Sequence, residues 1–455
     1  MPGLSQILEI ARRALSAQQM GMNVTSHNIS NANTPGYSRQ RMDLVASNPI
    51  WATGGLLGTG VTIGNISRIR EGFIDQQIRL NNNAYGSATA QQKILSQVEA
   101  NLNEPSDTGL STLMSKFFNS FQDLSVHPED SGSRTAVLQA GTMLAQKFRT
   151  LNTNLTQLRS DLTSDVGAKV DRINVLSQEI SALDGQITSA VAAGGDPGDA
   201  KDQRDLRIEE LSQLANINVS EDSRGSVTVS LGGIQIAAGS GPIALATRTV
   251  GDKLQVVESQ SGAIVNATGG EIGGTLKSYN TDIPSAISKL DQLAGAIISR
   301  VNTLHSAGFG LGNPPSTGNN FFTGSTSADI AVDPAISGNI NNIAASGTGA
   351  PGNNDVALAL SQVVGEPLLN GNSTSVTQFY GGLVADVGSS VSSADNTAQS
   401  QQLILTQLDN QRSSVSGVSL DEEMTNLIKY QRSYDAAARV VTTVDALFQT
   451  LLNIG

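Results

Sequence analysis

Two stretches at opposite ends of the chain carry the same helical spacing of apolar residues. Near the start, positions step by four and three residues without a break from Leu4 to Ile29, and near the end the same steps run from Leu420 to Val441. This spacing is typical of a coiled-coil seam, in which each helix buries one stripe against a partner. We therefore expect residues 1–35 and 419–455 to lie antiparallel, as one terminal coiled-coil domain. The seam positions expected at a helix or subunit interface are Leu4, Leu8, Leu15, Met22, Ile29, Met424, Leu427, Tyr434, Val441, Phe448 and Leu451.

The faces beside this seam contain very little charge. Residues 1–33 hold only Glu9, Arg12 and Arg13 as charged side chains. A lone coiled coil normally places charged residues on both flanks of its seam. An uncharged flank can pack on further helices without burying ions, so we expect contacts with neighbouring subunits. A solvated helix rich in Gln and Ser is the simpler alternative.

The middle of the chain predicts more long helices and one segment of different character. Leucines and isoleucines keep a helical period from Leu144 to Ile187, which indicates a single helix of roughly 60 residues. From residue 217 to 272 the pattern alternates, with Gly232-Gly233 between two short runs, as in a β-hairpin. The expected fold is mainly α with a small inserted β domain (217–272), a long-helix bundle domain with some hairpin and loop (36–216 plus 273–418), and the terminal coiled coil beside it. We expect the β insert at the end far from the termini, and dispensable for assembly.

Composition excludes several classes of function. The net charge of −12 argues against a protein that grips nucleic-acid phosphates, and the absence of cysteine excludes disulfides and thiolate metal sites. No apolar run approaches the ~18 residues of a membrane span, so no membrane insertion is expected. The start of the chain lacks the pattern of a cleaved secretory signal. Aromatic residues make up only 4% of the chain, which predicts an elongated or assembly-dependent molecule.

No motif supports catalysis, and we expect no enzyme, cofactor or metal site. The glycines between Gly54 and Gly60 lack the Gly-Lys-[Ser/Thr] ending of a phosphate loop and are followed by strand-like residues. The aspartates at 196, 199, 202 and 205 do not follow a calcium-loop spacing, so a solvated helix start is the favoured interpretation. His27 is expected at a helix end or an interface.

A polar motif follows the first helix: Asn31-Ala-Asn33-Thr34-Pro35-Gly36-Tyr37-Ser-Arg-Gln. Proline followed by glycine predicts a type II turn. This motif resembles the N-terminal signature of bacterial flagellar axial proteins, which are the rod, hook and hook-associated proteins, and its Tyr-Ser-Arg-Gln continuation is most similar to the hook-associated group. The last helix, from Val418 to Leu452, resembles the C-terminal helix of the same family, and interior segments at 202–214 and 290–308 resemble it as well.

The resemblance implies a structural protein that joins hook to filament and is required for flagellum assembly. It implies self-association into a ring, contacts with hook protein and with the filament-proximal junction protein, and an export chaperone that holds the C-terminal helix. It also implies type III export and an extracellular place at the hook–filament junction. Another axial protein (hook, rod or the filament-proximal junction protein) is the alternative, and a secreted coiled-coil effector is a more distant one.

Overall fold

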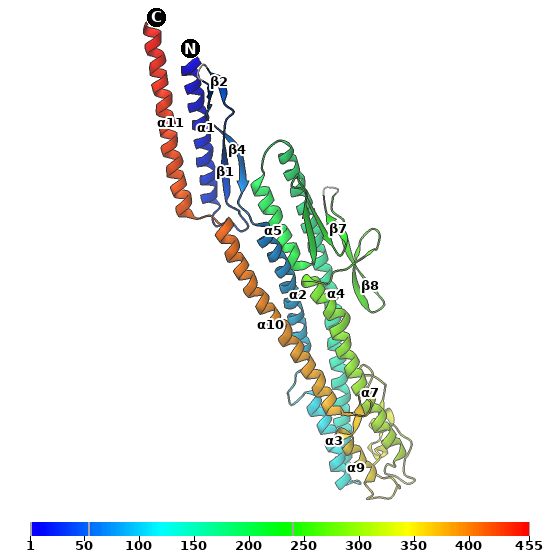
Figure 1. The fold of residues 1–455 in the computed structure, drawn as a ribbon. Coiled ribbons are helices and arrows are strands. Elements are labelled where there is room, and N and C mark those ends of the chain that lie inside the picture. The colour runs from blue at the N-terminus through cyan, green and yellow to red at the C-terminus, as the bar shows by residue number, and fades with distance from the viewer. Residues whose placement is uncertain (1, 53–54, 239–240, 455) are drawn as a thin grey trace.

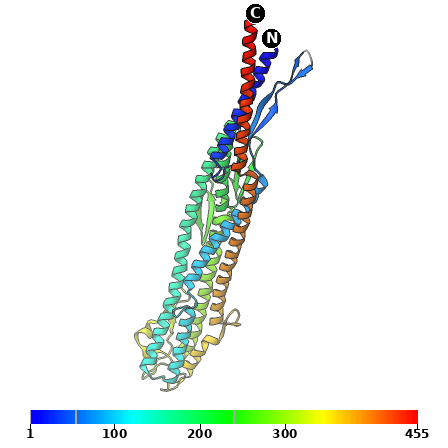
Figure 2. The same cartoon turned by 90° about the vertical axis from the view of Figure 1, so that its left-hand side faces the viewer.

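The chain forms an elongated bundle whose two termini lie at the same end (Figure 1). The computed structural model describes residues 2–52, 55–238 and 241–454. Most helices run along the length of the molecule, and Figure 2 shows the same bundle from the side. The expectation of an elongated, mainly helical molecule is confirmed.

The helices follow the periodicity of the sequence. Helix α4 is one uninterrupted helix of 62 residues, as the spacing predicted. Asp130 caps it by accepting a hydrogen bond from the Ser133 N–H at 2.7 Å, and Gly194, with a φ of 84°, follows its end. The longer helices are α1 (Pro2–Ser30), α2 (Gly72–Leu102), α3 (Leu110–Val126), α4 (Ser131–Ala192), α5 (Gly198–Leu214), α7 (Ile283–Ala307), α10 (Val376–Ser416) and α11 (Leu420–Ile454).

Short helices and strand pairs complete the bundle at 270–282 and 322–375. The short helices are α6 (Gly270–Lys277), a π-helical turn (Ser278–Asp282), α8 (Pro334–Gly338) and α9 (Asp355–Gln362). Two small antiparallel pairs join β11 (Phe322–Thr323) to β12 (Ala331–Val332) and β13 (Pro367–Leu369) to β14 (Thr374–Ser375).

Two hairpins lie beside the terminal helices. Strand β1 (Gln40–Ala46) pairs antiparallel with β4 (Val61–Arg68), and both contact α1. Between them, β2 (Ile50–Ala52) pairs with β3 (Gly55–Leu57). The division of the chain into three domains remains a prediction, but these contacts group residues 40–68 with the terminal helices rather than with the long bundle.

The expected place of the β insert is wrong. Two three-stranded sheets form there, β5–β6–β7 (Ile217–Glu221, Val227–Leu231, Ile234–Ala237) and β8–β9–β10 (Leu245–Val250, Lys253–Glu258, Ile264–Val265). They lie against α4 partway along the molecule, and the far end is formed by α3, α9 and the loops after α7 (Figure 1). The glycine pair at 232–233 does turn β6 into β7.

The two sheets lie partway along the molecule because they share an apolar core with α4. Val229, Leu231 and Ile236 are fully buried and belong to the same apolar cluster as Leu176 and Ile180 of α4. Removing 218–271 would uncover one side of α4, so the contacts argue against the expectation that the insert is dispensable. At the far end, six phenylalanines are almost completely buried and most stack edge to face; they are Phe117, Phe118, Phe121, Phe148, Phe321 and Phe322.

Among the described residues, no helix combines the length and apolar character needed to cross a bilayer.

Candidate subunit interface and its polar joint

Helices α1 and α11 lie side by side and antiparallel at the end that carries both termini (Figure 1). Gly21 of α1 sits directly under the ring of Tyr430, because a Cβ at position 21 would lie 2.8 Å from that ring. Seven residues further along α1, the Asn28 Nδ2 donates to the Glu423 Oε2 at 3.1 Å. Small and polar residues thus mediate the closest contacts between the two helices.

These contacts use a helix row next to the predicted seam. Gly21 and Asn28 precede the seam residues Met22 and Ile29 by one position, which is about 100° around the helix axis. The predicted interface residues are accordingly exposed at Leu8 (38%), Met424 (49%) and Leu451 (38%). The others are half-buried: Leu4, Leu15, Met22, Ile29, Leu427, Tyr434, Val441 and Phe448. Their role as a subunit interface remains a prediction.

The predicted turn after α1 is present. Tyr37 N–H donates to the Thr34 carbonyl at 3.2 Å, and Gly36 has a φ of 78°, which is the third-position geometry of a type II turn. Thr34 Oγ1 also donates to the Asn31 Oδ1 at 3.2 Å, whereas Asn33 and Pro35 face solvent. The turn redirects the chain from α1 toward β1.

The turn places Tyr37 back against α1. Its hydroxyl donates to the Asn28 Oδ1 at 2.7 Å and lies 3.0 Å from the His27 Nδ1. Burial, together with the carboxylates of Asp199, Asp202 and Glu423, raises the pKa of Tyr37 above its usual range. Tyr37 is therefore a neutral hydrogen-bond donor near pH 7. His27 lies in the last turn of α1, at the expected helix end.

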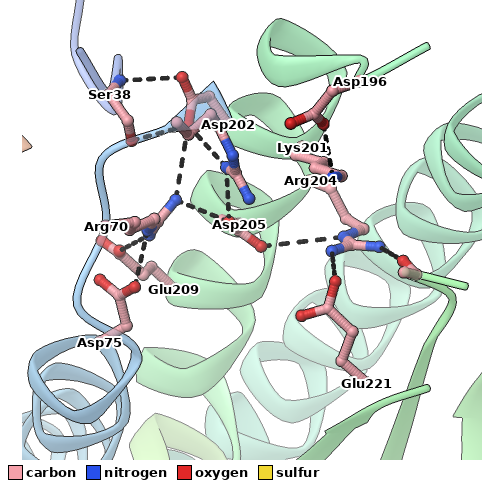
Figure 3. A network of polar contacts seen from close by, with 12 residues as sticks. Ser38, Arg70, Asp75, Asp196, Lys201, Asp202, Arg204, Asp205, Glu209 and Glu221 are labelled. Carbon is pink, nitrogen blue, oxygen red and sulfur yellow. Dashed lines mark hydrogen bonds and ion pairs between the residues drawn. The ribbon is translucent and has the colours of Figure 1, made fainter. Parts of the chain in front are cut away.

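A network of ion pairs joins this turn to the rest of the molecule (Figure 3). Asp202 on α5 accepts from the Ser38 N–H and from the Ser38 Oγ, each at 2.8 Å, and from the Arg68 Nη1 at 2.7 Å. One turn along α5, Asp205 accepts from the Arg70 Nη1 at 2.6 Å. The network links α1's exit, the β4 end and α5, and we call it the polar joint: Ser38, Arg68, Arg70, Asp75, Asp202, Asp205, Glu209 and Arg412.

The polar joint is shielded from water. Asp202 is 5% exposed, and Arg70 forms a second ion pair with Asp75 at 2.6 Å. Burial lowers the pKa of Arg70, but Asp205 and Asp75 raise it by more, so the net pKa lies above its ordinary value. Burial raises the pKa of Glu209 against the opposing effect of Arg412 and Arg70. A partner for every charge is the condition under which such a buried group is tolerated.

A second set of ion pairs at the same end of the molecule binds α11. Arg39, immediately after the turn, pairs with Glu422 and with the buried Glu423, each at 2.7 Å. Glu423 is 2% exposed and also accepts from Asn28. One short segment, 37–40, therefore contacts α1, α5 and α11 together, and it fixes how the terminal helices leave the bundle.

The interpretation of the aspartates as a solvated helix start is wrong for Asp202 and Asp205. Sequence reasoning also missed Arg68, Arg70 and Glu423 as structural partners. The sequence did contain a sign of these ion pairs. The acidic residues 202, 205 and 209 fall on one face of α5, and two arginines lie at the end of β4. Nothing in the sequence assigned those arginines to that face. Within the described residues, no group of three or more His, Asp or Glu is arranged to hold a metal ion.

Antiparallel terminal helices, a motif turn and a rod-like bundle define the class of flagellar axial structural proteins, and three family models match the chain accordingly. The flagellar hook-associated protein FlgK helical domain matches residues 95–322, the flagella basal body rod protein model matches 8–37, and the flagellar basal body rod FlgEFG protein C-terminal model matches 410–454.

Curated relatives identify the family. The chain is 32% identical to flagellar hook-associated protein 1 of Bacillus subtilis, over 98% of this chain and 97% of that protein. It is 28% identical to flagellar hook-associated protein 1 of Escherichia coli, over 99% of this chain and 100% of that protein. The chain belongs to the flagellar hook-associated protein 1 family. The resemblance seen in the motif and in the last helix is therefore confirmed.

A solved structure supports the fold. The flagellar hook junction protein FlgK from Burkholderia pseudomallei superposes with a TM-score of 0.65, covering 75% of this chain and 100% of that one, at 17% identity. Both share the arrangement of long helices. As a member of this family, the chain is an axial component of the flagellum and associates with other axial components.

Proposed function

We propose that this protein joins hook to filament as a purely structural component, without a catalytic step. The observation that carries the proposal is the paired end of α1 and α11, where predicted seam residues such as Leu8 and Met424 remain exposed in the single chain. Membership in the hook-associated protein 1 family supports it. Apolar seam residues left uncovered by the chain itself are suited to contacts with neighbouring subunits.

The proposal includes the assembly around the chain. Copies self-associate into a ring, with hook protein on one side and the filament-proximal junction protein on the other, outside the cell. Before assembly the chain passes unfolded through the type III channel, with a chaperone on α11. The weak packing between α1 and α11, made of small and polar contacts such as Gly21 and Asn28, suits a segment that must unfold for export. Another axial position, in hook or rod, is the alternative.

A seam variant tests the proposal. In a strain that lacks its own hook-associated protein 1, the wild-type chain should restore filaments on bare hooks. Met424→Asp should abolish them, because in an assembly it buries an unpaired carboxylate at a cost of several kcal/mol. In the monomer, where Met424 is 49% exposed, the same change should move the free energy of unfolding by less than about 0.5 kcal/mol.

Thr425→Asp is the matched control, because Thr425 is the next residue of α11, is exposed, and lies off the seam. It should leave filaments in place. Filaments that form normally with Met424→Asp would contradict the interface. Failure of the wild-type chain to restore filaments in any strain would contradict the hook–filament role itself.

A further inference from the structure

Residues 44–52 and 55–67 form an apolar arm beside the terminal helices. It comprises β2 and β3 with the adjoining ends of β1 and β4, and it contains no Asp, Glu, Lys or Arg. Its side chains are unusually open to solvent: Trp51 is 81% exposed, Leu56 59% and Val45 52%. Trp51 is the only tryptophan of the chain. Exposed apolar side chains gathered in one short segment are typical of a binding site.

The base of the arm contacts α1 through β1 and β4. The rest of the arm diverges obliquely from α1 and α11 (Figure 2). Trp51 pairs with Leu56 and Ile50 with Leu57 across the two strands, and each of these four side chains is exposed. A two-stranded hairpin is only marginally stable alone in water. The arm therefore needs an external surface to hold its shape.

The end of the same molecule presents a surface of matching chemistry. Apolar side chains are exposed on the first turns of α1 and the last turns of α11: Ile7, Leu8, Leu447, Leu451 and Leu452. Residues 446–455 carry no charged side chain, so an apolar arm can cover them without burying an unpaired ion. This surface lies at the same level along the molecule as the arm (Figure 1). A second copy beside the first would thus present its helix ends within reach of the arm of the first copy.

We propose that the apolar arm of one copy docks on the free ends of α1 and α11 of a second copy, with Trp51 as its anchor. This inference rests on the proposed function, because it assigns a surface to the lateral contact of an assembled ring. The arm runs along the terminal helices and diverges obliquely from them (Figure 2), so a neighbour whose helix ends stand at the same level lies within its reach. An anchor of one large aromatic residue surrounded by smaller apolar residues is typical of the centre of a protein interface.

The absence of cysteine makes cross-linking the direct test. Two differently tagged copies, one with Leu56→Cys and one with Leu451→Cys, are expressed together in the strain without its own protein, and isolated flagella are oxidised. Leu56 is the cross-strand partner of Trp51, so this variant keeps the anchor in place. A disulfide-linked pair carrying both tags is the expected product. The matched control replaces Leu56→Cys by Leu403→Cys, which is an exposed apolar position (73%) on α10, outside the arm. It should give no pair above background.

Substitutions of Trp51 and its fluorescence provide a second, independent test of the docking. Trp51→Ser should lower the number of assembled copies roughly tenfold or more, since a buried tryptophan anchor commonly accounts for that much affinity, and Trp51→Phe should restore most of it. The emission of Trp51 in the wild-type chain should shift to shorter wavelength on assembly. A shift seen with phosphatidylglycerol vesicles and not on assembly would assign the arm to a membrane and overturn the proposal.

The outcomes separate the two claims. If filaments form but the Leu56 pair cross-links no better than the Leu403 pair, the docking on a second copy is overturned while the hook–filament role stands. If the wild-type chain never enters flagella, the proposed function fails, and the arm's partner fails with it.

Discussion

The central bundle and the terminal helix pair are both built from long helices, yet they hold together in different ways. In the central bundle, large side chains such as Phe117 and Phe148 are completely buried, and each contributes about 1.5–3 kcal/mol by leaving water. In the terminal pair, the buried residues are small or polar: Ala11, Ala17, Val24, Thr25, Asn28, Glu423 and Val444. Helical periodicity alone therefore does not indicate whether a helix is stable without partners.

The polar joint lies between these two regions and connects them through charge rather than apolar area. Ser38 lies just before β1 and Arg68 at the end of β4, and their shared partner Asp202 lies far away in sequence. Because Asp202 is buried, the loss of its ion-pair partner is expensive. The joint thus fixes the direction of a weakly packed helix pair on a strongly packed bundle.

The substitution with the largest expected effect on the free energy of unfolding lies in the aromatic core. Phe117→Ala should lower the free energy of unfolding by about 3–5 kcal/mol, because it opens a cavity among Phe118, Phe121, Phe321 and Phe322. Urea unfolding followed by circular dichroism measures this. Phe73→Ala is the control, since Phe73 is 66% exposed and its loss should cost less than about 0.5 kcal/mol. Equal losses in both variants would mean that the burial of Phe117 does not account for the effect.

The second effect is a pH dependence of the same core. His305 is buried; it donates from Nδ1 to the Asn319 carbonyl at 2.7 Å and accepts at Nε2 from the Ala344 N–H at 2.9 Å. Burial lowers the pKa of His305 to about 4, from 6.5. The neutral ring is the form that fits, so the unfolded chain binds the proton first. Stability is therefore complete above pH 6.5 and declines by about 3 kcal/mol as the pH falls to about 4.

Variants separate this effect from general acid denaturation. His305→Gln should flatten the slope of unfolding free energy between pH 6.5 and 4, while His127→Gln, at an exposed position, should leave it unchanged. A slope that persists in His305→Gln would show that other groups cause it.

The smallest effect concerns the terminal pair. Alanine is favoured over glycine within a helix by about 1 kcal/mol, but at Gly21 the new Cβ meets the Tyr430 ring, and such overpacking costs about 1–3 kcal/mol. Gly21→Ala should loosen α1 from α11 and speed amide exchange in residues 5–30. Gly3→Ala, on the same helix with nothing within 4 Å, should slow exchange or leave it unchanged. Slower exchange in both would mean that the contact at Tyr430 contributes nothing.

Local signals predicted much of the fold. The run from Leu144 to Ile187 predicted a single helix because its period is unbroken, and α4 is one helix of 62 residues. Pro35-Gly36 predicted the turn because only glycine adopts its positive φ easily. The hairpin turn predicted at Gly232-Gly233 is present for the same reason, since both glycines have a positive φ. The terminal motif also pointed to the right family before any contact was known.

Other features depended on groups that are distant in sequence. The sheets 217–265 lie against α4 because their apolar faces complete its core, and the alternating pattern could not indicate which helix they would cover. Asp202 looked like a solvent-exposed residue because its partners, Ser38 and Arg68, lie more than a hundred residues away. The exposure of Trp51 was likewise not visible, because a strand pattern does not tell which face is left open.

The sequence by itself determined that the two terminal runs and the run from Leu144 to Ile187 are helical, that a turn follows the first helix, and which family the chain belongs to. Each of these rests on residues that are neighbours along the chain. Only the tertiary structure decided which row of α1 meets α11, which charges pair in the polar joint, and that the large apolar side chains of β2 and β3 are left exposed. The physical reason is that burial and ion pairing depend on distances through space, and a helix or strand offers several faces among which only packing chooses.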